Sequence, residues 1–286
     1  MKTSTEIGSL LDAVTFERAI ELVAKAGFDA WDFSMHPLVS YDKKTDTVIK
    51  KDMRFCGDGY IEFAKELRRV GEKHGIYCNQ AHAPFPSVPK MMPYIRRAIE
   101  CTAAAGGKIC VVHPWNDATP EENAQMYREL LPLAKSLGVK IATENMWNWD
   151  IEREVATEAA CSLPDNFNEH LDLVNDGDLV ACLDLGHAEM FQGRTSAPEM
   201  IRALGPRLKA LHIHDNDRRH DSHAIPFTMD IDFGEIIDAL REIGYSGDFT
   251  LEADGYVLTR EEEVPPHLEK LYSAITRFCR MFEKMA

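Results

Sequence analysis

The stretch Lys209-Ala-Leu-His-Ile-His-Asp-Asn-Asp, residues 209–217, begins as a short apolar alternation and ends in polar side chains. A β-strand places successive side chains on opposite faces, so His212 and His214 point one way while Leu211 and Ile213 point the other. Two imidazoles on one face, followed at once by carboxylates, are typical of a metal or acid/base site. They could equally be buried histidines that only bond backbone carbonyls. The other strands decide between these interpretations.

Short β-branched or apolar runs alternate with helical patterns along the whole chain. We expect strands near residues 3–7, 28–33, 76–81, 108–112, 139–143, 179–183, 209–213 and 248–252. We expect helices between them, near residues 15–26, 59–74, 91–105, 120–137, 166–176, 197–204, 233–243 and 261–284. Crossovers of this length predict a parallel sheet. The eight units therefore predict an α/β fold: a single (β/α)8 TIM barrel, with residues 1–286 as one domain.

Helix boundaries are marked by capping residues. Thr119-Pro120-Glu121-Glu122 offers a capping hydroxyl, a proline at the first helical position and a glutamate three residues after the cap. Asp232 with Glu235, and Thr259 with Glu262, repeat this spacing. Glycines also stand where helices should end and a left-handed residue is favoured, at Gly27, Gly75, Gly106, Gly138 and Gly244.

Three connections that follow strands are long: residues 34–57, 186–196 and 214–231. Long connections are usually functional or disordered. In this fold all three would lie at the C-terminal mouth of the barrel, where active sites are built.

Six consecutive predicted strands deliver metal-ligating side chains to that mouth. In chain order these are His82, His113, Glu144, Asp184, His212 and Glu252, with His187 just after the sixth strand. Each has an ordinary explanation when taken alone, such as a turn residue or half of an ion pair. Together they indicate a site for a divalent cation, because converging carboxylates cannot all stay ionised cheaply when partly buried. Nitrogen and oxygen ligands suit Zn, Mn, Co or Mg.

Composition narrows the function further. The formal net charge is −15, with 47 acidic and 32 basic residues, which makes nucleic acid an unlikely partner because phosphate affinity comes mostly from Lys and Arg. No apolar run reaches the roughly 18 residues of a membrane span, and residues 1–8 contain no signal-peptide core. Seven scattered cysteines suit reduced thiols, so we expect a cytoplasmic protein. A homo-oligomer is possible.

The whole chain resembles the xylose isomerase-like TIM barrels, which include sugar and sugar-phosphate isomerases, sugar 3-epimerases and endonuclease IV. The resemblance implies that Glu144, Asp184, His212 and Glu252 hold one metal ion. It also implies that Glu144 and Glu252 act as the acid/base pair on opposite faces of the substrate. By the same resemblance, His187 and Arg218 contact the substrate.

Endonuclease IV adds five ligands for two more zinc ions. Residues of the same types stand at His82, His113, His187, Asp221 and His223, so these side chains are predicted to bind either substrate or additional metal. The sequence departs from that enzyme in its first strand, which reads Thr5-Glu6-Ile7-Gly8-Ser9-Leu10 where the endonuclease carries a His-Val-Ser signature. After Glu144 it has Asn145-Met146-Trp147-Asn148-Trp149 where the endonuclease has a small, glycine-containing loop, and its Asp-x-His at residues 221–223 comes slightly early.

Two activities follow. The first is a divalent-metal-dependent isomerase or epimerase that acts on a small sugar, sugar phosphate or polyol ketone through an enediolate, with Trp115, Trp147 and Trp149 as candidate pocket walls. The second is a metal-dependent phosphodiesterase that cuts abasic DNA, which the acidic charge disfavours. In either case residues 34–57 are expected to form a lid over the mouth.

Overall fold

A computed structural model describes residues 1–191 and 193–284. Eight parallel strands form one sheet in the order β11-β10-β7-β6-β5-β2-β1-β12. The strands are β1 (Thr3–Glu6), β2 (Ala30–Ser34), β5 (Tyr77–His82), β6 (Ile109–Val111), β7 (Lys140–Glu144), β10 (Leu179–Asp184), β11 (Leu208–His212) and β12 (Phe249–Leu251). A parallel bridge between Ile213 and Leu251 joins the two edge strands, β11 and β12. The prediction of a (β/α)8 barrel is confirmed.

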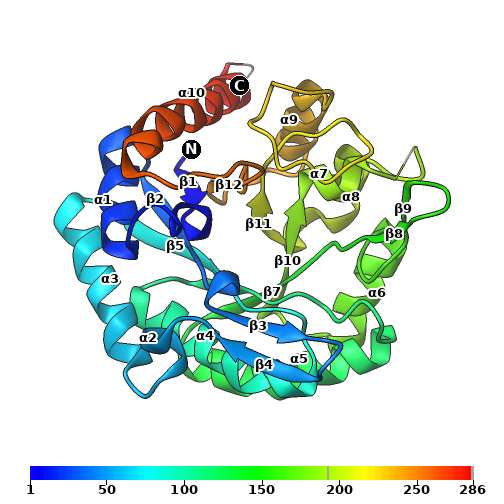
Figure 1. Cartoon of the computed structure of the whole chain (residues 1–286). Coiled ribbons are helices and arrows are strands. Elements are labelled where there is room, and N and C mark those ends of the chain that lie inside the picture. Colours follow the sequence, from blue (N-terminus) through cyan, green and yellow to red (C-terminus); the bar gives the residue numbers. More distant parts are fainter. Residues whose placement is uncertain (192, 285–286) are drawn as a thin grey trace.

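Eight longer helices surround the strands (Figure 1). They are α1 (Phe16–Ala26), α3 (Tyr60–His74), α4 (Met92–Ala105), α5 (Pro120–Ser136), α6 (Pro164–Val174), α8 (Ala197–Leu204), α9 (Phe233–Glu242) and α10 (Val264–Glu283). Each buries one apolar stripe against the sheet, as where Phe16 of α1 packs edge-on against Phe33 of β2 at 5.7 Å. Inside the barrel, small residues such as Ala142, Cys182 and Ala210 form a separate apolar cluster.

Most of the predicted helix ends are confirmed. Thr119 and Glu122 form a capping box, and all five predicted glycines have positive φ, between 66° and 107°. The cap predicted at Thr259 and Glu262 is wrong, because α10 begins at Val264 and the preceding turn is closed by Arg260 and Glu263. Prolines 265 and 266 explain this, since neither has an N–H to extend the helix ladder backwards.

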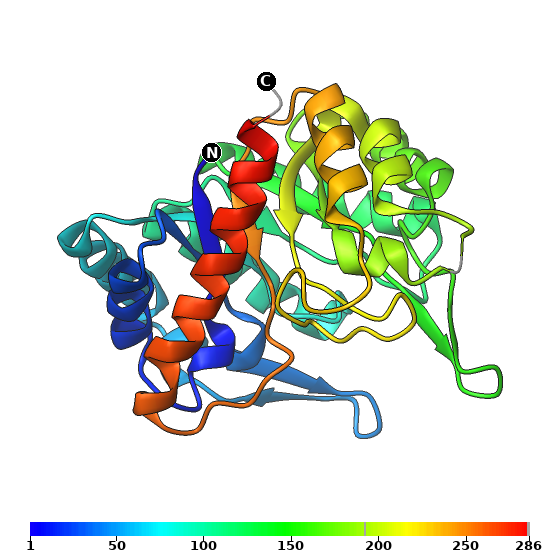
Figure 2. The same ribbon diagram turned by 90° about the horizontal axis from the view of Figure 1, so that it is seen from above.

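The long connections at the mouth carry secondary structure of their own. Residues 34–57 contain a hairpin, β3 (Val39–Asp42) with β4 (Thr47–Lys50), and the short helix α2 (Met53–Cys56). β10, the sixth strand of the barrel, is followed by α7 (Leu185–Glu189). A second hairpin, β8 (Asn148–Asp150) with β9 (Val155–Thr157), lies in a fourth long connection that the sequence pattern did not predict. Both hairpins project from the end of the barrel opposite the termini (Figure 2).

The connection after β11 is organised by one buried carboxylate. Asp215 accepts hydrogen bonds from the backbone N–H groups of Thr228, Met229 and Ile231 at 2.8–3.1 Å, and its own backbone pairs with Ala224. These bonds fix a loop that would otherwise have few constraints.

None of the described helices is both long and apolar enough to cross a membrane.

Candidate metal centre and active site

The predicted strand-end residues meet at one mouth, because the C-terminal ends of parallel strands lie together. They surround a cavity of about 320 Å³. Its lining includes most of the predicted residues: His82, His113, Glu144, His187, Asp221, His223 and Glu252. Asp184 and His212 lie beside it, fully buried.

Two carboxylates flank one imidazole nitrogen at the centre of this site. Nδ1 of His212 lies 2.9 Å from Oε1 of Glu144 and 3.1 Å from Oε2 of Glu252. With Asp184, these residues bring four potential ligand atoms within 4.8 Å of one another. Nε2 of His212 faces Oδ2 of Asp32, 3.8 Å away on β2. A carboxylate behind a metal-ligating histidine is a common way to orient the ring.

Each glutamate also uses its second oxygen. Oε2 of Glu144 lies 3.1 Å from Nε2 of His113, and Oε1 of Glu252 lies 3.2 Å from Nδ1 of His82. The two histidines are in turn 2.7 Å apart through their Nε2 atoms. His82 and His113 therefore hold both glutamates in place from the β5 and β6 side of the cavity.

Asp184 is positioned by its neighbours at the ends of β7 and β10. The backbone N–H of Asp184 donates to Oδ1 of Asn145, and the Asn145 amide donates back to the carbonyl of Asp184. Oδ1 of Asp184 accepts from the backbone N–H of His187 and lies 3.0 Å from Nε2 of His214. Oδ2 is buried and has no hydrogen-bond partner among the described residues.

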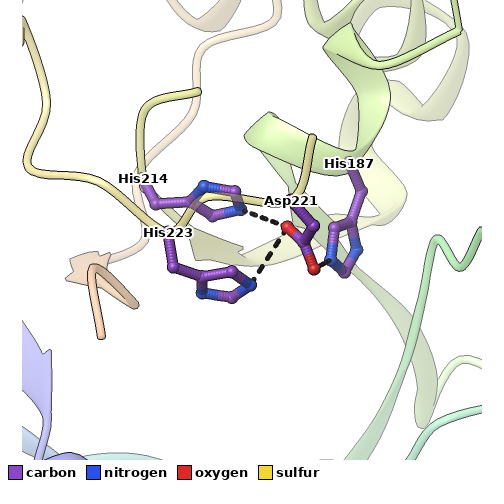
Figure 3. A group of neighbouring side chains, drawn as sticks. All are labelled: His187, His214, Asp221 and His223. Atoms are coloured by element: carbon purple, nitrogen blue, oxygen red, sulfur yellow. Dashed lines mark ion pairs between the residues drawn. The ribbon is translucent and has the colours of Figure 1, made fainter. Parts of the chain in front are cut away.

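A second cluster lies next to the first, because Nε2 of its His214 is 3.0 Å from Oδ1 of Asp184. Its four residues are drawn in Figure 3. Asp221 stands between three imidazoles, with carboxylate-to-nitrogen distances of 3.3 Å to His187, 3.6 Å to His214 and 3.1 Å to His223. The rings of His214 and His223 stack at 4.0 Å. These four residues also bring potential ligand atoms within 4.8 Å of one another.

The charges of the two clusters depend on each other. Burial raises the pKa of Glu144, but the imidazoles of His212 and His113 outweigh it and hold this pKa well below its usual range. His212 and His82 do the same for the pKa of Glu252. Burial lowers the pKa of His187, yet the carboxylates of Asp184 and Asp221 raise it to about 10. Both glutamates are therefore ionised at neutral pH.

The donor set fits a divalent cation. The orphaned Oδ2 of Asp184 is a buried oxygen that an ion would satisfy, and three carboxylates around one imidazole need positive charge between them. Cys182 also lies close to Glu144 and His212, which the sequence pattern did not predict. Burial raises the pKa of its thiol to about 12, so the sulfur is protonated as long as no cation is bound beside it.

Some predicted contacts lie elsewhere. Arg218 pairs with Glu189 at 3.0 Å and is not among the described residues that line the cavity, so its contact with substrate stays a prediction. Trp147 lines the cavity, and Trp115 lines a neighbouring one. Trp149 packs against Trp147 and His220.

Three further residues of the site were missing from the predicted set: His36 and Asp254 line the cavity, and Asp32 lies behind His212. His214, which the sequence pattern placed on the same strand face as His212, belongs to the second cluster. Oδ1 of Asp254 lies 2.8 Å from Nδ1 of His223. One signal was available: Asp254 follows Glu252 by two residues, just as His214 follows His212.

The family model of the xylose isomerase-like TIM barrel matches residues 20–274. The chain belongs to the xylose isomerase-like TIM barrel family. Three solved structures of this barrel type are similar to it. The first is a D-tagatose 3-epimerase-like protein, with 21% identity and a TM-score of 0.74 over 100% of both chains. The second is D-psicose 3-epimerase with D-tagatose from Clostridium cellulolyticum H10, with 16% identity and a TM-score of 0.70 over 99% of this chain and 100% of that one. The third is IolI protein with a bound zinc atom, with 18% identity and a TM-score of 0.69 over 100% and 99%. At these identities the three structures show a shared fold, and the function of this family member must be argued from its own site.

Proposed function

We propose that this protein is a divalent-cation-dependent isomerase or epimerase of a small sugar or related ketone. The observation that carries the proposal is the pair Glu144 and Glu252. Both carboxylates flank Nδ1 of His212, and both line the same cavity. Two carboxylates converging on one small cavity can exchange protons with a carbon atom, the ionised one as the base and the other, once protonated, as the acid.

Glu144, Asp184, His212 and Glu252 would hold the cation. When bound, it would supply Lewis-acid polarisation of a substrate carbonyl. The ionised carboxylate of one glutamate removes the proton from the carbon next to that carbonyl. The other glutamate, protonated beforehand by solvent or a neighbouring imidazole, delivers a proton to the opposite face of the enediolate, and the first glutamate then releases its proton to solvent. Each such step contributes about 10²–10⁴-fold to the rate. His113 and His82 orient the second oxygen of each glutamate, and Trp147 helps to exclude water.

The solved structures that support this reading are named as sugar 3-epimerases, and one neighbour of the same fold binds zinc. We also propose a cytoplasmic location, a homo-oligomer and one domain over residues 1–286.

A second candidate is a phosphodiesterase of the endonuclease IV kind, which acts on abasic DNA. The observation in its favour is that potential ligands gather in several overlapping groups, among them His82, His113 and Glu144; Glu144, Asp184, His212 and Glu252; and the cluster around Asp221. The net charge of −15 argues against it, as does a cavity whose described lining contains no Lys or Arg.

The proposal is tested by incubating the protein with a panel of ketoses and following their interconversion by chromatography. We expect one ketose to be converted, activity to vanish on treatment with a chelator, and a divalent cation to restore it. The same preparation is incubated with duplex DNA that contains an abasic site at low salt. Efficient strand cleavage without conversion of any ketose would replace this proposal with the second candidate.

A further inference from the structure

A second cavity, here called the annex, adjoins the candidate active site. Its volume is about 480 Å³, larger than that of the active-site cavity, and both are bounded by Phe85, His113 and Met146. The other apolar residues that line the annex are Tyr41, Pro86, Val88, Pro114 and Trp115. A molecule bound beside Glu144 and Glu252 therefore has room to extend past Phe85.

Two aromatic residues of the annex are held by neighbouring residues. Phe85 rests one ring face on His113, with centroids 4.8 Å apart, and the residue remains 43% exposed. The backbone of Trp115 is held by the buried Asn123, which accepts from its N–H at 2.8 Å and donates to its carbonyl at 3.2 Å. Aromatic side chains in the wall of a cavity suit a ligand with a flat apolar face.

The edge of the annex is polar. Asn116 donates to the carbonyl of Trp147 at 3.2 Å, and its Oδ1 has no hydrogen-bond partner among the described residues. Lys43, in the turn of the β3–β4 hairpin, pairs with Asp117 across the rim at 3.1 Å. Flat apolar walls with hydrogen-bonding groups at the edge match a sugar ring, which has C–H faces and hydroxyl groups around its edge.

The charge of the site indicates an uncharged ligand. The described residues that line the active-site cavity include no Lys or Arg, and Lys43 of the annex is already paired with Asp117. Three arginines of the mouth loops are also engaged by carboxylates: Arg218 by Glu189, Arg219 by Glu154, and Arg194 by Glu158. Among the described residues that line the two cavities, the single Lys or Arg is Lys43, and it is paired with Asp117.

We propose that the substrate is an uncharged disaccharide whose reacting sugar is a ketose with its carbonyl free. Its reacting sugar occupies the active-site cavity, and a second sugar ring attached to it lies in the annex between Trp115 and Phe85. The identity of the reacting sugar rests on the proposed function, whereas the position of the second ring rests on the annex alone.

Binding can be tested without turnover. Calorimetric titration of the full-length, zinc-loaded protein with glucose, cellobiose and phenyl β-glucoside compares one ring, two sugar rings and an aromatic aglycone. We expect cellobiose to bind roughly tenfold more tightly than glucose, about the gain from one or two stacking contacts. Trp115→Ala should remove that gain and leave glucose affinity unchanged. Trp149→Ala, which removes a tryptophan outside the annex, should keep the gain.

Other results would overturn the inference. Equal affinity for all three probes would show that the annex takes no ring, and a gain for phenyl β-glucoside alone would show that it takes an aromatic aglycone instead of a sugar. If Trp115→Ala fails to fold, Val88→Trp fills the annex from another side and should also abolish the gain. Failure of the proposed chemistry would appear separately, as normal cellobiose binding by a protein that converts no ketose.

Discussion

Oδ1 of Asp184 lies 3.0 Å from Nε2 of His214, whereas Oδ2 of the same carboxylate is buried with no hydrogen-bond partner among the described residues. One half of the side chain is thus used by the protein, and the other half is available to a cation. Glu144 and Glu252 each place one carboxylate oxygen beside Nδ1 of His212, so both face the same place in the site. The cation would complete an arrangement that the surrounding hydrogen bonds already hold.

Asp184→Asn tests this division of roles. The variant keeps an oxygen for the N–H donors of His187 and His214 but loses the charge that the cation needs. We expect cation affinity, measured by calorimetry, to fall by more than the 10–100-fold typical of an outer-shell substitution. The melting temperature without cation should change little. Asp172→Asn, at an exposed aspartate that pairs with Arg207, is the control. Unchanged affinity in Asp184→Asn would remove this residue from the site.

The cluster around Asp221 predicts more than one ion per chain. Three imidazoles and a carboxylate form a donor set that suits zinc. We expect elemental analysis to find at least two zinc ions in the wild type and one fewer in His223→Gln. The control is His220→Gln, at a nearby histidine that is 53% exposed. One ion in all three proteins would make the cluster a substrate-binding element, while three in the wild type would strengthen the phosphodiesterase alternative.

Glu6 predicts a pH dependence of stability. Burial, with a contribution from Asp254, raises the pKa of Glu6 from 4.5 to about 8. Between these two pH values the folded chain binds a proton that the unfolded chain has lost, so stability falls as the pH rises, by up to about 1.4 kcal/mol per pH unit. Glu6→Gln should lose this decline, so its stability relative to the wild type should increase from pH 5 to pH 8. Urea denaturation at four pH values measures the difference, with exposed Glu66→Gln as control. A difference that does not change with pH would contradict the burial of an ionisable group here.

The lid prediction for residues 34–57 now concerns a defined hairpin. Its strands β3 and β4 are partly exposed. Two ion pairs tie its turn to neighbouring loops, Lys43 of the turn with Asp117 and Asp46 of the turn with Lys90. Such exposed contacts are individually weak, so the hairpin can open. Amide hydrogen exchange in this segment should slow when a saturating sugar ligand is added, while exchange in α9 stays constant. Equal exchange with and without ligand would mean that the hairpin is a fixed wall.

The barrel could be predicted from the sequence because its signals are local. Strand runs, helix caps and the five glycines each depend on a few neighbouring residues. The β8–β9 hairpin was missed because Asn148–Asp150 is only three residues long and shows no apolar alternation. Its partner strand, Val155–Thr157, is equally short and shows no clearer pattern. Such hairpins are decided by packing at the mouth, which the local pattern does not contain.

The site was predictable to the extent that strand order determines it. Parallel strands bring their C-terminal residues together, so His82, His113, Glu144 and Glu252 could be expected to meet. His36 lies in a loop whose path depends on the rest of the fold, and no spacing rule places it in the cavity. Arg218 has the expected spacing from His212, but its side chain turns to Glu189, a partner that only the tertiary structure reveals.

Solvent exchange tests the central claim most directly. The cation-loaded protein is incubated with ketoses in D₂O, and deuterium at the carbon next to the carbonyl is measured by NMR. We predict incorporation into one ketose, reduced at least about 100-fold in Glu144→Gln and in Glu252→Gln, because each removes an acid/base step. Glu158→Gln, at a surface glutamate, should exchange like the wild type. Incorporation into no ketose, together with efficient cleavage of abasic DNA by the same preparation, would contradict the account.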